Sequence, residues 1–171
     1  MKKIPFVYNH GEDSAGIDLN VIGKVTERDS TGVSINGIFN WVRRDSRGVD
    51  ITGIIKNVDE DSKGVDLTGL LKGVQGDFTG LQITGLYNEV QSNSKGVSIA
   101  GLVNYSEGVN DFLIQYGTMG NYVKEKSDGT FGLQIGLYNK VGKQTSPLIN
   151  FWGIKNIPKL LKKAISKKSE E

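Results

Sequence analysis

Side chains suited to acid–base or nucleophilic chemistry are few in this chain of 171 residues. His10 is the only histidine, and it stands beside Glu12 and Asp13 in a stretch typical of a solvated loop. Cysteine is absent, which excludes disulfides, thiolate metal sites and cysteine nucleophiles. A serine triad would have to use His10, and no G-x-S-x-G motif is present to hold the serine. We therefore predict that the protein is not an enzyme and has no catalytic residues; an enzyme of unrecognised type that uses Asp, Lys or Tyr side chains is the alternative.

Metal and phosphate sites are not indicated either. Asp59, Glu60, Asp61 and Asp66 form an acidic group, but their spacing is not that of a calcium-binding EF-hand loop. Glycine is frequent, yet the G-x-x-x-x-G-K-[ST] phosphate loop is absent. We predict no metal and no cofactor, and we interpret the acidic group as solvated turn charge.

A repeat of sixteen residues organises most of the chain. Position three of every copy is glycine, position eight is glycine in five of the six copies, and no insertion breaks the register. The copies begin at Ser14, Ser30, Ser46, Ser62, Phe78 and Ser94. Self-similarity at a fixed period is the signature of a repeat architecture.

Each copy is interpreted as a strand of about eleven residues followed by a polar turn of about five. Glycine at two positions of every copy argues against helix. In a regular strand, the apolar residues at positions four and six would lie on one side and the apolar residue at position nine on the other. The later segment at Gly132–Val141 lacks one residue and alternates cleanly, so we predict a β-bulge at the Thr-Gly step of positions seven and eight. Positions four, six, nine, eleven and thirteen are then expected to face inward, and position five outward.

The predicted outer side carries a second apolar stripe, which we call the outer stripe. It occupies position ten, with additional aromatic residues at position twelve. Its members are Phe39, Trp41, Ile55, Leu71, Tyr87, Val103 and Tyr105. A contiguous exposed apolar surface is unusual for a soluble sheet and marks a candidate interaction surface.

Two all-β architectures fit the period. In an up-and-down antiparallel meander each copy is one strand, whereas in a β-solenoid each copy is one coil with the glycine step as a corner. Turn chemistry favours the meander, and Ser127–Gly129 looks like the turn of an ordinary hairpin. A sheet of eight to ten strands tends to curl, so we expect the meander to close into a barrel. The solenoid remains the alternative.

The segment 155–171 differs from the repeat domain at 1–154. Apolar residues at helical spacing alternate with lysines, which predicts a basic amphipathic helix. Its candidate interaction residues are Lys159, Lys162 and Lys163. The helix either caps the sheet or docks on an anionic membrane surface. Nucleic-acid binding is disfavoured because the body of the chain offers no basic stripe.

At "GLQIGLYN" (Gly132–Asn139), and with one extra residue at "GLQITGLYN" (Gly80–Asn88), the chain resembles bacterial surface-repeat proteins with tandem GLQIGLxN units. The resemblance extends over Ser14–Val141. It implies a repeat-built β domain but no particular activity. Relatives of that kind are usually exported, whereas this chain departs from them in its basic tail and in lacking an evident signal peptide.

These features predict a non-enzymatic structural or interaction module on a repeat β scaffold. A protein partner or self-association would use the outer stripe or the helix. The alternative is a barrel that binds an apolar small molecule or lipid, with the basic helix as a lid or membrane-docking element. No stretch is apolar for long enough to span a membrane as a helix. We expect a cytoplasmic protein, and the basic helix would allow it to contact a membrane surface peripherally.

Overall fold

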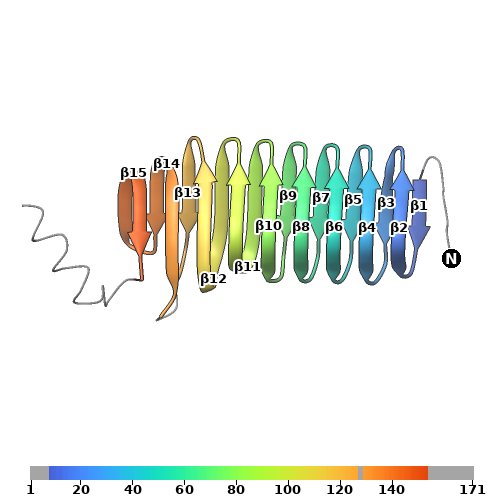
Figure 1. Cartoon of the computed structure of the whole chain (residues 1–171), viewed down its shortest axis with the longest axis horizontal. Helices are drawn as coiled ribbons and strands as arrows, with labels where there is room; N and C mark the ends of the chain where they lie inside the picture. Colours follow the sequence, from blue (N-terminus) through green and yellow to red (C-terminus); the bar gives the residue numbers. More distant parts are fainter. Residues whose placement is uncertain (1–7, 127–128, 154–171) are drawn as a thin grey trace, which may run out of the picture.

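The computed structural model describes residues 8–126 and 129–153, and these residues form strands and turns without any helix. Figure 1 shows the strands stacked side by side along one long axis. The fifteen strands are β1 (Tyr8–Gly11), β2 (Ser14–Asn20), β3 (Gly23–Thr26), β4 (Ser30–Asn36), β5 (Phe39–Val42), β6 (Ser46–Thr52), β7 (Ile55–Val58), β8 (Ser62–Thr68), β9 (Leu71–Val74), β10 (Phe78–Thr84), β11 (Tyr87–Ala100), β12 (Val103–Gly117), β13 (Gly120–Val123), β14 (Phe131–Val141) and β15 (Gln144–Trp152).

Each sixteen-residue copy forms one coil of a β-solenoid. A seven-residue strand covers positions one to seven, a corner follows, and a four-residue strand covers positions ten to thirteen. Successive coils pair in parallel and in register, so that Ser62 lies between Ser46 and Phe78. The long strands form one sheet and the short strands another, and β11, β12 and β14 contribute to both. We call the same position in successive coils a column.

The predicted all-β repeat is confirmed, but the antiparallel meander and the barrel are wrong. Every strand pair in the described residues is parallel except β14 with β15. The hairpin expected at Ser127–Gly129 is also wrong, because β13 and β14 on either side of it pair in parallel. The solenoid alternative is therefore the correct architecture. The predicted helix at 155–171 lies outside the described residues.

The direction of the side chains is largely inverted relative to the prediction. Positions four, six and nine, expected inside, face outward, and Leu70 at position nine is 41% exposed. Position five, expected outside, is buried in every coil. Positions eleven and thirteen face inward as predicted. The interior columns are therefore positions one, five, seven, eleven and thirteen, and most of them are polar.

The predicted bulge at the Thr-Gly step is a corner between two strands. A Cβ on Gly53 would overlap the backbone carbonyl of Gly37 in the preceding coil, so the corner requires glycine for close backbone approach. The left-handed backbone angles lie instead at position three, where Gly80 has a φ of 137°.

The apolar core is confined to the edge where the short strand turns into the next coil. The column at position thirteen supplies Val42, Val58, Val74 and Val90, which pack with Phe78. A second cluster near the C-terminal end joins Val109, Leu113, Val123 and Val141 to Trp152. Since Trp152 belongs to β15, this antiparallel strand covers the last coil.

Candidate functional site

The centre of the solenoid contains a buried ion-pair network. Position eleven supplies Lys24, Lys56 and Lys72, which are each at most 2% exposed. Position five supplies the facing carboxylates Asp18, Asp50 and Asp66. Lys24 Nζ lies 2.8 Å from Asp18 Oδ2, and Lys72 Nζ lies 2.5 Å from Asp66 Oδ2. Lys56 contacts both Asp50 and Asp66. Three ammonium groups thus face three carboxylates.

The pKa values of Lys56 and Lys72 differ because different numbers of carboxylates surround the two lysines. Burial alone would lower the pKa of Lys56, but the carboxylates of Asp66 and Asp50 outweigh it and raise that pKa. Burial lowers the pKa of Lys72 to about 8, because only Asp66 pairs with it directly while Lys56 repels it. Burial alone would raise the pKa of Asp66, but Lys56 and Lys72 hold it well below its usual range.

Asparagine ladders continue the polar interior towards the C-terminal coils. Asn88 donates to Asn104 Oδ1 at 3.0 Å, Asn104 to Asn121 Oδ1 at 2.9 Å, and Asn121 to Asn139 Oδ1 at 2.8 Å. The same side-chain amides donate to backbone carbonyls of the long strands, as Asn104 does to Tyr116 at 2.7 Å. Each amide therefore joins adjacent coils and also bridges the two sheets.

The interior offers no chemistry to an external substrate, since its ionisable groups are enclosed by both sheets. Outside it, His10 contacts Glu27 at 2.9 Å in an exposed pair. Asp59 in the acidic group accepts hydrogen bonds from Trp41 and Asn57, whereas Asp66 is a member of the buried network. The described residues contain no cluster able to hold a metal ion. None of them forms a helix that could traverse a lipid bilayer.

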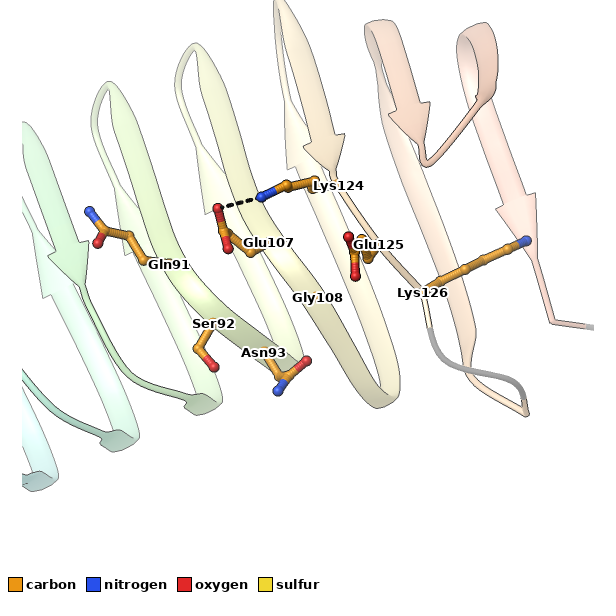
Figure 2. A pocket seen from close by; sticks show the side chains of 8 residues that line it. All are labelled: Gln91, Ser92, Asn93, Glu107, Gly108, Lys124, Glu125 and Lys126. Carbon is orange, nitrogen blue, oxygen red and sulfur yellow. Dashed lines mark hydrogen bonds and ion pairs between the residues drawn. The ribbon is translucent and has the colours of Figure 1, made fainter.

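A polar hollow lies on the edge formed by the turns (Figure 2). It lies where β11, β12 and the residues that follow β13 are side by side, next to Gly108 of β12. Glu107 and Lys124 pair across it at 3.1 Å. Its lining residues are Gln91, Ser92, Asn93, Glu107, Gly108, Lys124, Glu125 and Lys126. We assign this exposed hollow no chemistry.

The more distinctive surface is the outside of the long-strand sheet, which we call the aliphatic face. Two columns of apolar side chains, at positions four and six, run along it through eight strands. Position four supplies Ile17, Val33, Val49, Val65, Leu81, Val97, Ile114 and Leu133. Position six supplies Leu19, Ile35, Ile51, Leu67, Ile83, Ile99, Tyr116 and Ile135. None of these side chains is buried, and Ile17 is 61% exposed.

The residues of the predicted outer stripe lie on the opposite sheet. Phe39, Ile55, Leu71, Tyr87 and Val103 point outward from the short strands. Trp41 and Tyr105 lie two positions further along, and the Tyr105 ring stacks on Tyr122 with centroids 5.2 Å apart. The structure therefore gathers all seven on one face. Lys159, Lys162 and Lys163 lie outside the described residues.

Sequence reasoning missed the aliphatic face because it assigned those columns to the interior. A signal was present in the polar columns: position one is almost always serine, and position eleven is always lysine or asparagine. Identical polar side chains can hydrogen-bond along a stack, so such columns can fill an interior without apolar residues.

Comparison with known proteins assigns this chain to no family. No protein-family model, no curated protein and no solved structure matches this chain. The function must therefore be argued from the geometry of the surfaces.

Proposed function

We propose that the protein is a non-enzymatic interaction module that binds a partner through its apolar outer surface. The observation that carries this proposal is the uninterrupted pair of aliphatic columns in water along eight strands. An apolar surface of that extent is uncommon on a monomeric soluble protein and is stabilised when a partner covers it.

The interior supports the same proposal. The alternative function, an apolar ligand held inside a barrel, required an apolar cavity. In the described residues the space between the sheets is filled by lysine, aspartate, asparagine and serine side chains. A lipid or apolar molecule would therefore have to bind on the outside, where it would compete with a protein for the same faces.

A photoreactive amino acid introduced into the full chain tests the proposal. Placed at Ile51 or Leu71, on the two outer faces, it is expected to form specific adducts in cells that produce the protein. Glu60 in an exposed turn is the matched control and is expected to give none. Adduct yields at Ile51 and Leu71 no higher than at Glu60 would refute the interaction module.

A further inference from the structure

We propose that the aliphatic face binds the aliphatic face of a second copy of this chain, giving a two-fold dimer. This inference rests on the interaction module proposed above and names its partner.

The area of the aliphatic face matches the need of a stable dimer. Eight strand segments of about seven residues each, spaced by about 4.8 Å, cover about 38 Å by about 23 Å, or about 900 Å². A specific interface of standard size takes about 800 Å² from each partner. The face is therefore large enough to hold two chains together without help from other surfaces.

The period of the face favours a second copy over other partners. The coils keep nearly the same direction along the stack, so the columns run straight (Figure 1). Two faces with the same rung spacing interdigitate along their whole length, as identical side chains do in steric zippers. A partner with another period fits such columns only locally. The β-branched side chains at positions four and six also keep few rotamers, so packing them loses little conformational freedom.

Charge selects the relative orientation of the two copies. The column at position two lies beside the aliphatic columns and includes Lys63, together with Arg47 and Lys95, which pair with Asp45 and Asp111. If the copies packed with their ends reversed, the two basic columns would face each other. If the coils of both copies run in the same order, the two-fold axis places the basic columns on opposite sides of the interface. We therefore assign the parallel arrangement, in which position four of one copy faces position six of the other.

Sedimentation of the full chain over a range of concentrations tests the dimer. We expect the wild type to sediment with the mass of two chains. Ile51→Lys places an ammonium group in the interface on the third of its eight strands, and we expect it to raise the dissociation constant of the dimer at least about a hundredfold. Ile51→Thr keeps the β-branched shape and is expected to weaken the dimer in the same direction. Leu71→Lys on the opposite face is the matched control, because Leu71 and Ile51 are similarly exposed, at 41% and 38%.

Each outcome decides the proposal. A chain that remains monomeric at every concentration, a larger open assembly, or a dimer lost in Leu71→Lys but kept in Ile51→Lys would each overturn it. A monomeric chain that still forms photoadducts with another molecule at Ile51 would overturn the dimer and leave the interaction module standing. Absence of adducts at both outer faces would remove the interaction module itself.

A cysteine cross-link tests the orientation, since the chain has no cysteine of its own. In the parallel arrangement Ile35→Cys of one copy lies near Ile35→Cys of the other, and a short bis-maleimide is expected to join them. With the ends reversed the two would be about five rungs, or about 24 Å, apart. Cross-linking only between Ile35→Cys and Tyr116→Cys chains would overturn the parallel arrangement.

Discussion

At the scale of single residues, the buried lysines and aspartates are the most demanding feature of the molecule. An ion taken out of water loses its hydration, and a partner charge compensates only when the geometry is close. Lys56 has two such partners, Asp50 and Asp66, whereas Lys72 has Asp66 and the amide oxygen of Gln82 at 2.7 Å. Removing Lys56 therefore leaves Asp50 without an opposite charge. Removing Lys72 leaves neither carboxylate without one, because Asp66 still contacts Lys56.

We expect Lys56→Met to destabilise the fold by about 3–5 kcal/mol, because it leaves the buried Asp50 carboxylate without an opposite charge. Lys72→Met is expected to cost about 1–3 kcal/mol, because Asp66 keeps its contact with Lys56. Urea unfolding of both variants measures the difference. An equal or larger loss in Lys72→Met would contradict the unequal sharing of charge.

The pKa shifts predict how stability depends on pH. The pKa of Lys72 is about 8 in the folded chain and is lowered from 10.5. Between these two values the unfolded chain binds the extra proton, so the free energy of unfolding should rise with pH from about 8 to about 10. Lys72→Met lacks this rise and serves as the control for urea titrations across that range. A parallel pH dependence of the two chains would refute the assignment.

Asp66 should make stability rise with pH in the same direction but in the acid range, because its pKa is also lowered in the folded chain. Lys56 and Lys72 hold its pKa below the ordinary value, so its contribution to stability is present above that value. The contribution is lost as the pH falls through the folded-state pKa. Asp66→Asn, measured alongside the wild type, should therefore show a weaker loss of stability on acidification.

At the scale of elements, the corner between long and short strand depends on backbone contact between successive coils. Gly53→Ala would force the corner away from the carbonyl of Gly37, and we expect it to cost at least about 1–3 kcal/mol. Gly11→Ala is the matched control, because its added methyl would meet its nearest neighbour at 3.9 Å. Equal stability of the two variants in urea would show that the corner tolerates a side chain.

The all-β repeat and its period could be predicted from sequence, but the inner and outer sides of the long strands could not. Alternation shows which residues share a side of a strand, and it does not show which side faces the core. Val49 and Ile51 were assigned inward because apolar residues usually fill interiors, yet Asp50 between them is the buried one. The rule failed because the interior is stabilised by the contact of Asp50 with Lys56, whose residue types look solvent-exposed in a sequence.

The outer stripe was predicted on the correct side for a related reason. The apolar residues at position ten, such as Phe39, Leu71 and Tyr87, are each followed by a polar residue at position eleven. In the meander and in the solenoid alike, position ten then faces outward and position eleven faces inward. The parallel pairing itself depends on contacts between coils sixteen residues apart, which no local pattern of strand and turn residues reveals.

At the scale of the whole molecule, each coil contacts only the coils before and after it. Stability in such stacks is close to a sum of coil and interface contributions. We expect hydrogen exchange to be slowest in the central strands β6, β8 and β10 and faster in β2, which pairs only with β4 among the described residues. Mass spectrometry of exchanged peptides measures this gradient, and equal protection of β2 and β8 would contradict it.

The matching of lysine and aspartate also governs how such a molecule can lengthen over evolutionary time. Duplicating the coil Ser46–Asp61 adds both Asp50 and Lys56, so every new unit brings its own counterion and extends the rod by about 4.8 Å. Duplicating Ser62–Asp77 does the same with Asp66 and Lys72. A copy that gained one member of the pair alone would enclose an uncompensated charge, so this protein can grow only in units whose buried charges balance.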